Sequence, residues 1–428
     1  MKVLHLSFSD NQGGAAIAAQ RIHQSLLRDG VDSKMLVVSK TVRDSSILRI
    51  APSTHPTRRF ARALRRFCID SSLSIHTHGD PHQLFSDDRS WLGAELAAGL
   101  PDYDILHLHW VAGMVDYGAF LPKVAAQAPL VWTLHDMNPF TGGCHYDSLC
   151  GRFTEECGSC PLVKKPSARD YSHRVWKHKQ AAFGQIPRDR LHIVTPSRWL
   201  TGEAARSSLF RDFPISTIPY GVDLEEFAPR DKQFTRKFLG IPEDALVVLF
   251  VAQSVSDKRK GCGLLLEALK QLDNVFLLSL GDGEPLVSKN GMHLEFIRNK
   301  RFPSLVYSAA DVFAIPSLED NLPQTVLESM ACGVPVVGFR TGGVPDVVEH
   351  GVTGLLVQKG DSLGLSTALQ SLLSDEEVRS RMSLQSRKVA EEMFAYSRQA
   401  QAYRKIYADL LGDGSGKKPV KVAGLAEL

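Results

Sequence analysis

The chain has 428 residues, of which 43% are hydrophobic and 23% are charged, and its formal net charge is +3. This composition is typical of a globular protein with about two to three domains, and the nearly balanced charge argues against nucleic-acid binding. The first residues enter a strand without an apolar signal sequence, and no run of about 18 uncharged apolar residues follows, so we expect a cytoplasmic protein without a membrane span.

The first half of the chain alternates short apolar runs with helical patterns. The runs are rich in Val, Leu and Ile and are bounded by Gly, Pro or Asp, as in parallel strands that helices cover on both faces. They predict strands at 2–8, 34–39, 104–110, 130–136 and 191–196, and a helix over Ala15–Arg28. In the third strand, His107 and His109 are interpreted as structural residues rather than ligands.

Two adjacent glycines, Gly13 and Gly14, lie between the first strand and the first helix. The backbone amides of such a turn can approach a phosphate, and the start of the helix favours an anion. A tight turn without a ligand explains the same two glycines equally well.

The stretch "RRFARALRRF" at 58–67 carries five arginines, with Phe60, Leu64 and Phe67 at roughly helical spacing. It predicts a basic amphipathic helix, which could lie on an anionic membrane surface. A solvated helix that packs its phenylalanines inward is the alternative.

Four of the seven cysteines lie in one loop at 141–161, namely Cys144, Cys150, Cys157 and Cys160. The pair in "CGSC" has the spacing of a metal knuckle, and the other pair would complete a tetrahedral structural zinc site. The five-residue gap in the first pair fits known motifs less well. Disulfides and unliganded cysteines remain as alternatives, and His145 is a possible substitute ligand.

The second half repeats the pattern of the first. It predicts strands at 246–252, 275–281, 311–317, 334–339 and 353–357, and helices at 263–272 and 324–332. The whole chain therefore predicts an α/β fold with two doubly wound, Rossmann-like domains. We expect an N-terminal domain at 1–200, a C-terminal domain at 201–393, a helix at 394–411 that packs back toward the N-terminal domain, and a disordered tail at 412–428.

The richest group of polar residues follows the strand at 311–317. Glu319, Asp320, Asn321 and Leu322 form a loop before a helix that carries Glu328. Open α/β sheets bind ligands at this edge, where carboxylates accept hydrogen bonds from sugar hydroxyls and free amides meet phosphate.

The segment "DKRKG" follows the strand at 246–252 and carries Lys258, Arg259 and Lys260. Cations at the carboxyl edge of a sheet suit a diphosphate. A solvated run of charges is the alternative.

The combination of these motifs is similar to the family 4 retaining glycosyltransferases, which have the GT-B fold. The resemblance covers about residues 1–411 and rests on "PSLEDNLPQTVLESMACGVPVV", "TIPYGVDLEEFAP", "KRKG", "GGAAIAAQRI", "LGDGEP" and "YSAADVFAIPS". Within the family, "TLHDMNPFTGGCHY" and the cysteines that follow most resemble bacterial exopolysaccharide, capsule and colanic-acid transferases.

The resemblance implies a role for several residues. Glu328 would hold the ribose of a sugar nucleotide, Asp320 would contact the donor sugar, and Lys260 would neutralise the diphosphate with the amides of Gly13 and Gly14. His135 matches the family histidine at the donor sugar and, with Asp320 and Lys260, forms the expected catalytic set.

The sequence departs from the family pattern at two positions. The first acid is Asp320, unless Glu319 substitutes for it. Gln253 and Ser254 lie where the family often has an arginine. Lys258 would then take over the role of that arginine.

The resemblance implies a retaining transfer from a nucleotide-diphosphate sugar to a saccharide acceptor. Family members do this without an essential metal, so zinc would be structural only. The arginine-rich stretch at 58–67 favours a lipid-linked acceptor at the inner membrane face, in surface polysaccharide synthesis. A soluble sugar synthase or epimerase, and a non-catalytic nucleotide-sugar-binding protein, are the alternatives.

Overall fold

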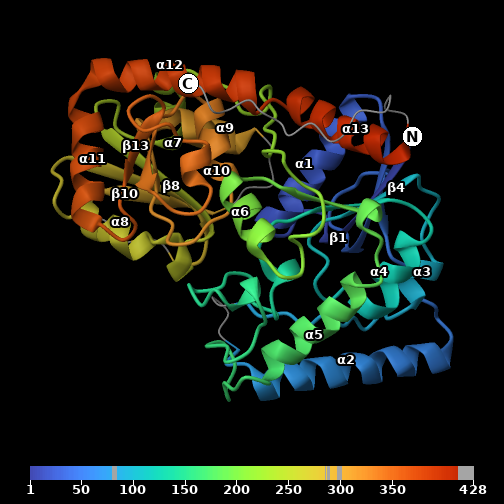
Figure 1. Cartoon of the computed structure of the whole chain (residues 1–428). Coiled ribbons are helices and arrows are strands. Elements are labelled where there is room, and N and C mark those ends of the chain that lie inside the picture. The colour runs from blue at the N-terminus through green and yellow to red at the C-terminus, as the bar shows by residue number, and fades with distance from the viewer. Residues whose placement is uncertain (80–83, 285, 287–289, 296–300, 413–428) are drawn as a thin grey trace.

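The computed structural model describes residues 1–79, 84–284, 286, 290–295 and 301–412. Within these residues the strands form two parallel sheets, and helices lie on both faces of each sheet (Figure 1). The predicted α/β fold with two doubly wound domains is confirmed. The predicted tail lies outside the described residues from 413 onward.

The first sheet, in the part of the chain that the structure describes, has seven strands in the order β3-β2-β1-β4-β5-β6-β7. The strands are β1 (Lys2–Ser9), β2 (Asp32–Ser39), β3 (Ile47–Arg49), β4 (Ile105–Leu108), β5 (Leu130–Thr133), β6 (Leu191–Thr195) and β7 (Ile215–Thr217). The helices before β7 are α1 (Gly14–Arg28), α2 (Pro56–His76), α3 (Glu95–Ala98), α4 (Tyr117–Ala125), α5 (Tyr171–Phe183) and α6 (Arg198–Arg206). Alternate side chains of β1 enter opposite cores, Leu4 toward α4 and α5 and Val3 toward α1, as the pleat of a strand requires.

The second sheet has six described strands in the order β10-β9-β8-β11-β12-β13. They are β8 (Leu246–Ser254), β9 (Val275–Asp282), β10 (Gly291–Leu294), β11 (Val312–Ile315), β12 (Val336–Phe339) and β13 (Gly354–Val357). The helices from α7 on are α7 (Lys232–Leu239), α8 (Cys262–Leu269), α9 (Phe302–Ala309), α10 (Gln324–Ala331), α11 (Ser362–Ser374), α12 (Glu376–Met393) and α13 (Tyr396–Leu411). Short 3-10 turns are η1 (Asn138–Phe140), η2 (Arg152–Thr154), η3 (Arg188–Arg190), η4 (Lys258–Lys260) and η5 (Val344–Asp346).

The first sheet extends beyond the domain boundary predicted at residue 200. β7 pairs in parallel with β6, so residues up to Thr217 belong to the first sheet. The sequence did not predict β3 or β10, because these strands are only three or four residues long and lack a continuous apolar run.

The chain passes between the domains at two neighbouring places. The first is the segment 218–223, and the second is the junction between α12 and α13. Val222 N donates to Phe394 O at 2.7 Å, which ties the two passages together. After this junction α13 lies along α1 on the first domain, where Tyr403 and Tyr407 are buried (Figure 1).

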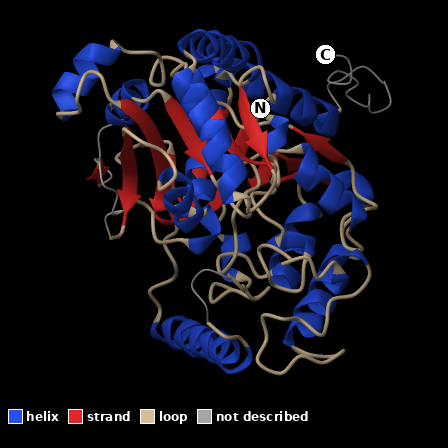
Figure 2. Cartoon of the chain, turned by 90° about the vertical axis from the view of Figure 1, so that its left-hand side faces the viewer, coloured by secondary structure: helices blue, strands red, loops and turns tan. Residues whose placement is uncertain are grey.

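Helix α2 stands apart from both sheets, at the lower edge of the molecule in both views (Figures 1 and 2). Of its 21 residues, only Ile69 is buried. Arg62 and Arg65 tie the helix to the first domain through ion pairs with Glu95 and Asp116. None of the described helices, α2 included, has the length and hydropathy needed to cross a membrane.

Candidate active site between the domains

The carboxyl ends of β8 and β11 bring a lysine and an aspartate together. Lys260 lies in η4 after β8, Asp320 lies in the loop after β11, and Lys260 Nζ is 2.6 Å from Asp320 Oδ2. Ser317 Oγ donates to the same carboxylate oxygen at 3.3 Å. The two residues are 60 positions apart in the sequence and meet because β8 and β11 are parallel neighbours.

Asp320 is held ionised although it is only 8% exposed. Burial alone would raise the pKa of Asp320, but the charges of Lys260 and Arg259 and the hydrogen bonds outweigh it, and the pKa lies below its usual range. The carboxylate is therefore an acceptor at neutral pH, and part of the Lys260 charge is already engaged by it.

Two glycines allow this close packing. Gly261 follows Lys260 with φ +72, and a Cβ atom there would lie 1.8 Å from the carbonyl oxygen of Pro316 at the end of β11. A Cβ atom on Gly342 would lie 1.7 Å from the carbonyl oxygen of Asp320. Only glycine lets the chain approach at both places, so the glycine of "KRKG" is needed to bring η4 against β11.

Arg259 is the second cation at this edge. Its Nη1 donates to the carbonyl oxygen of Glu319 at 2.8 Å, and its guanidinium carbon lies 5.3 Å from the centroid of the Tyr146 ring. Lys258, to which the sequence assigns the role of the family arginine, is exposed. Of Lys258 and Arg259, it is therefore Arg259 that is directed at the loop of Asp320.

Glu328 lies on α10 and contacts both domains. Its Oε1 is 2.6 Å from Arg21 Nη2 on α1, and its Oε2 accepts from Tyr307 O–H at 2.8 Å. Both side chains of the ion pair are 12% exposed. Burial opposes the charge of Arg21, but Glu328 overcomes this effect and raises the Arg21 pKa above its ordinary value. Arg21 is a site residue that the sequence did not predict.

The glycine turn of the first domain faces α10 as well. Gln324 Nε2 donates to the carbonyl oxygen of Gly14 at 2.6 Å, and Gln324 Oε1 accepts from Arg21. A Cβ atom on Gly13 would lie 3.6 Å from Gln253 Oε1 at the end of β8. The structure thus brings Gly13 and Gly14 to the same interface as Glu328.

His135 follows β5 and meets the loop of Asp320 across the interface. The Asn321 amide nitrogen donates to the carbonyl oxygen of His135 at 3.1 Å, and its amide oxygen accepts from Ser197 Oγ at 2.7 Å. Leu322 next to it is buried in the core of the second domain. Asn321 therefore links the histidine of one domain to the acidic loop of the other.

Both ring nitrogens of His135 have protein partners. Nδ1 lies 2.6 Å from the Tyr220 hydroxyl, and Nε2 lies 3.2 Å from His109 Nδ1. Burial lowers the pKa of His135 to about 4, so the ring is neutral at pH 7. The sequence predicted His135 but not these two partners.

The four cysteines lie near one another without converging on one point. Cys144 and Cys160 share a small apolar cluster, Cys157 Sγ accepts from Gly142 N at 3.1 Å, and Cys150 is half-buried. His145, the substitute ligand suggested by the sequence, pairs with Asp136 at 2.6 Å. Among the described residues, the set of three or more metal-ligand side chains whose atoms gather within 4.8 Å is instead His5, His107 and His109.

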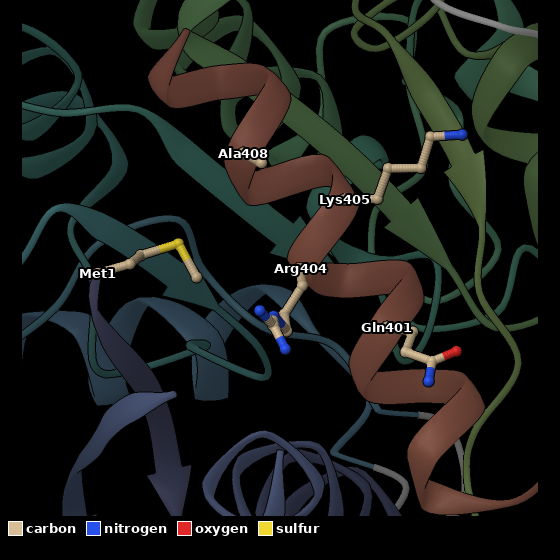
Figure 3. Close-up of a pocket in the computed structure, with 5 residues that line it drawn as sticks. All are labelled: Met1, Gln401, Arg404, Lys405 and Ala408. Atoms are coloured by element: carbon tan, nitrogen blue, oxygen red, sulfur yellow. The ribbon is translucent and has the colours of Figure 1, made fainter. Parts of the chain in front are cut away.

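A surface hollow of about 450 Å³ lies far from these residues. It is lined by side chains of α13 and by the N-terminus, namely Met1, Gln401, Arg404, Lys405 and Ala408 (Figure 3). None of them belongs to the group around Asp320 and Glu328, so we place the candidate site at the domain interface.

One family model matches part of the second domain, and the curated relatives match longer parts of the chain. Residues 231–389 match the family "Glycosyl transferases group 1". A D-inositol 3-phosphate glycosyltransferase of Mycobacterium sp. (strain KMS) is 26% identical over 380 residues, covering 85% of this chain and 78% of its own. An N-acetyl-alpha-D-glucosaminyl L-malate synthase of Bacillus anthracis is 29% identical over 215 residues, covering 48% and 56%.

Solved structures share the fold over nearly the whole chain. Sucrose-phosphate synthase from Thermosynechococcus elongatus superposes with a TM-score of 0.68 at 18% identity, covering 97% of this chain and 100% of its own. Anabaena HepE in complex with UDP-glucose superposes with a TM-score of 0.62 at 18% identity, covering 96% and 100%.

Proposed function

We propose that this chain, which has the GT-B fold and whose residues 231–389 match the group 1 glycosyl transferases, transfers a sugar, with retention, from a nucleoside-diphosphate donor. The observation that carries this proposal is the meeting of Lys260, Asp320 and Glu328 at one domain interface. Cations for a diphosphate and carboxylates for hydroxyls are the two kinds of group that a sugar nucleotide requires.

Each charged group has a place in this reaction. The leaving diphosphate develops negative charge, and Lys260 and Arg259 stabilise it together with the amides of the glycine turn. Asp320 accepts from a hydroxyl of the donor sugar, and Glu328 accepts from the ribose. The acceptor attacks from the side of the leaving group, whose phosphate oxygen takes the acceptor proton.

The conformation described here is closed around these groups. Arg21 forms an ion pair with Glu328, and Gln324 donates a hydrogen bond to the carbonyl oxygen of Gly14. A nucleotide that binds Glu328 would displace Arg21 from it, and separation of the two domains would allow this. When the two domains close again over the bound donor, they would exclude the water that otherwise hydrolyses the donor.

For the acceptor we propose a saccharide on a lipid carrier, in surface polysaccharide synthesis. Helix α2 exposes Phe60, Phe67 and Ile75 by 71%, 69% and 65%, beside Arg58 and Arg59. An exposed apolar stripe flanked by arginines suits the surface of an anionic membrane. We therefore propose that α2 holds the enzyme at the inner membrane face.

A small anionic acceptor is the second candidate. The curated relatives described above are named for D-inositol 3-phosphate and L-malate, both of which carry negative charge. Such an acceptor would leave the exposed stripe of α2 without a role, so the lipid-linked acceptor explains more of the structure.

We also propose that Cys144, Cys150, Cys157 and Cys160 hold a structural zinc ion. Four thiolates are a common ligand set for structural zinc. These cysteines lie in the same loop as Tyr146, whose ring contacts the guanidinium of Arg259. In the conformation described, the thiols do not yet share one centre, so zinc binding would require the loop to rearrange.

Thermal denaturation with UDP-, GDP- and ADP-sugars tests the donor. We expect one nucleotide class to raise the melting temperature of the wild-type chain, and Lys260→Ala and Glu328→Ala to reduce this rise. If none of these sugar nucleotides changes the melting temperature, the proposed function is wrong.

A further inference from the structure

One side chain of the first domain reaches the residues of the second domain to which we assign the nucleotide. Arg21, on α1, extends to α10, where its Nη2 lies 2.6 Å from Glu328 Oε1 and its Nη1 donates to Gln324 Oε1 at 2.9 Å. Its guanidinium carbon also lies 5.3 Å from the centroid of the Phe227 ring, which is buried in the core of the second domain. All three contacts of this first-domain arginine are thus with the second domain.

The other oxygen of Glu328 is already engaged inside the second domain. Tyr307 O–H donates to Glu328 Oε2 at 2.8 Å, and the Tyr307 side chain is fully buried. Oε1 is therefore the oxygen that is left for a partner outside the domain, and Arg21 pairs with it. With Arg21 in place the Glu328 side chain is only 12% exposed, so little of the carboxylate is open to a ribose and the two groups must compete for it.

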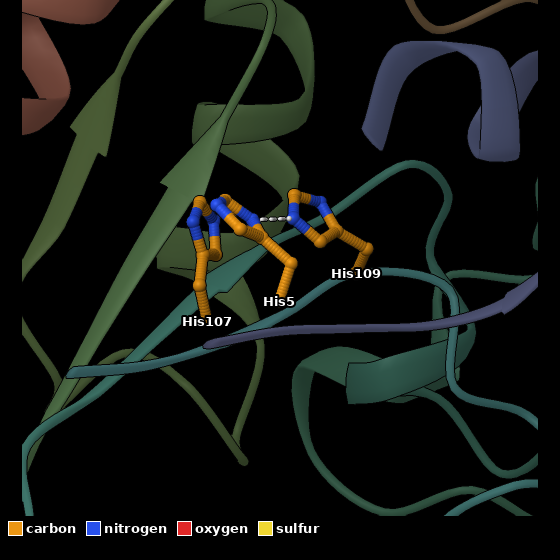
Figure 4. Close-up of side chains that lie close together, drawn as sticks. All are labelled: His5, His107 and His109. Carbon is orange, nitrogen blue, oxygen red and sulfur yellow. Dashed lines mark hydrogen bonds between the residues drawn. The ribbon is translucent and has the colours of Figure 1, made fainter. Parts of the chain in front are cut away.

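Helix α1, which carries Arg21, is fixed to the first domain. Ile22 is fully buried in the core of this domain, and both ring nitrogens of His23 lie within hydrogen-bond distance of serine hydroxyls. The His23 ring centroid is 5.6 Å from that of His5, which belongs to the group of buried histidines shown in Figure 4. The helix is thus held in place, so Arg21 leaves Glu328 either by rotation of its own side chain or together with the whole domain.

A displaced Arg21 would still have an acidic neighbour. Burial opposes the charge of Arg21, but Glu328 and, more weakly, Glu226 raise its pKa. A second carboxylate therefore lies within electrostatic reach of the guanidinium. Because an uncompensated buried charge is costly, this neighbour makes the exchange of Arg21 for a ribose reversible.

We propose that Arg21 is an autoinhibitory residue, which pairs with Glu328 in the protein without nucleotide and which the ribose of the donor must displace. This inference rests on the proposed function, because it takes Glu328 as the carboxylate that binds the ribose. The apparent affinity for the nucleotide is then the intrinsic affinity reduced by the fraction of molecules in which Glu328 is free of Arg21. Removing Arg21 raises the affinity, whereas removing a residue that binds the nucleotide lowers it.

Arg28 provides a matched control later on the same helix. It forms an ion pair of the same length, 2.6 Å, with Asp223, and its guanidinium carbon lies 5.2 Å from the centroid of the Tyr396 ring. This pair lies beside the two passages of the chain between the domains, and the Arg28 side chain is 53% exposed. Its loss removes an arginine from α1 without freeing Glu328, so the affinity for the nucleotide should not change.

Isothermal titration with UDP, GDP and ADP compares the wild type with Arg21→Met and Arg28→Met. We expect the nucleotide that binds the wild type to bind Arg21→Met about 5- to 150-fold more tightly, the usual range of coupling between two competing interactions. Arg28→Met should bind it as the wild type does. Inorganic pyrophosphate has no ribose, so its affinity should be the same for the wild type and Arg21→Met.

A second variant covers poor folding of Arg21→Met. Arg21→Gln removes the charge but keeps a polar amide, and it should also bind the nucleotide more tightly. The proposal is overturned if neither Arg21 variant binds more tightly than the wild type, if Arg28→Met gains as much, or if pyrophosphate gains as much as the nucleotide. These results leave the proposed function standing, since the wild type still binds. If none of the chains binds any of the three nucleotides, the proposed function fails and this inference fails with it.

Discussion

Arg21 of the first domain and Glu328 of the second form an ion pair of 2.6 Å, although they are 307 positions apart in the sequence. Both side chains are 12% exposed, and the pair links the two domains at the carboxylate to which our proposal assigns the ribose. Without a nucleotide, the Glu328 carboxylate thus links the two domains through Arg21. By our proposal, the same carboxylate accepts from the ribose when a nucleotide is bound.

The ion pair should behave as a coupled unit in a double-mutant cycle. Removing one partner leaves the other charge nearly buried, so Arg21→Met and Glu328→Gln should each lower the free energy of unfolding by about 3 kcal/mol. The double variant should lose less than the sum, with a coupling of about 1–3 kcal/mol by urea denaturation. Additive losses would show that the contact does not contribute to stability.

Lys260 and Arg259 should matter for nucleotide binding, and Lys258 should not. Lys260→Met and Arg259→Met remove a cation directed at the loop of Asp320, so each should weaken binding of the nucleoside diphosphate of the proposed donor about 10- to 100-fold, as expected for a hydrogen bond to a charged group. Lys258→Met removes an exposed cation from the same turn and is the matched control. Isothermal titration with the nucleoside diphosphate (UDP, GDP or ADP) whose sugar stabilises the wild type measures all three, and an equal loss for Lys258→Met would contradict the assignment.

Much of the fold could be predicted, because buried parallel strands appear in the sequence as continuous apolar runs. The runs at 246–252 and 275–281 lie within β8 and β9. The short strand β10, which the sequence did not predict, has no such run, and its residues are half-buried or exposed. Strand length and burial therefore decide what a single sequence reveals.

The site was predictable where it follows strand ends and not where it depends on distant pairs. Lys260 and Asp320 each follow an apolar run, and the sheet then brings them together. Arg21 meets Glu328, and Tyr220 meets His135, only after two domains have packed. The spacing of residues along the sequence does not reveal such pairs, so the sequence predicted neither Arg21 nor the partners of His135.

The rate at which the four thiols react should show whether the cysteines bind a metal ion. Without metal, burial raises the pKa of Cys157 to about 12, and Cys144 and Cys160 shift in the same direction. These thiols should then react slowly at neutral pH, after the exposed Cys68.

Metal analysis decides between the two states of this loop. On protein purified without chelator, we expect one zinc ion per chain, which Cys157→Ala and Cys160→Ala should lose. Cys262→Ala, outside the loop, is the control. Protein that contains no metal and has four titratable thiols in the loop would end the zinc proposal.

The apolar stripe of α2 should govern binding to anionic vesicles. Phe60→Ser with Phe67→Ser removes two side chains that would enter the lipid interface, and at about 1.5–3 kcal/mol for each buried ring the affinity should fall at least about tenfold. Phe234→Ser with Phe238→Ser is the control, since both rings are 61% exposed on another basic helix, α7. Flotation with phosphatidylglycerol vesicles measures binding. An equal loss in both variants, or no binding by the wild type, would refute membrane docking through α2.

The buried histidines should make the protein lose stability as the pH falls below 6.5. Burial lowers the pKa of His5, His23, His107, His109 and His135, to about 4 for His23 and His135. The unfolded chain therefore binds more protons between pH 6.5 and 4, and each histidine lowers the free energy of unfolding by up to about 1.4 kcal/mol per pH unit in that range.

Asp88 acts in the opposite direction but does not cancel this effect. Burial and the neighbouring Asp87 raise its pKa to about 6, so its protonation favours the folded state, yet it opposes five histidines. Urea denaturation at pH 7.5, 6.0 and 5.0 should show a steep decline, and His23→Gln should reduce the slope by the share of one histidine. A free energy of unfolding that stays constant from pH 7.5 to 5.0 would contradict the lowered pKa of these rings in the folded protein.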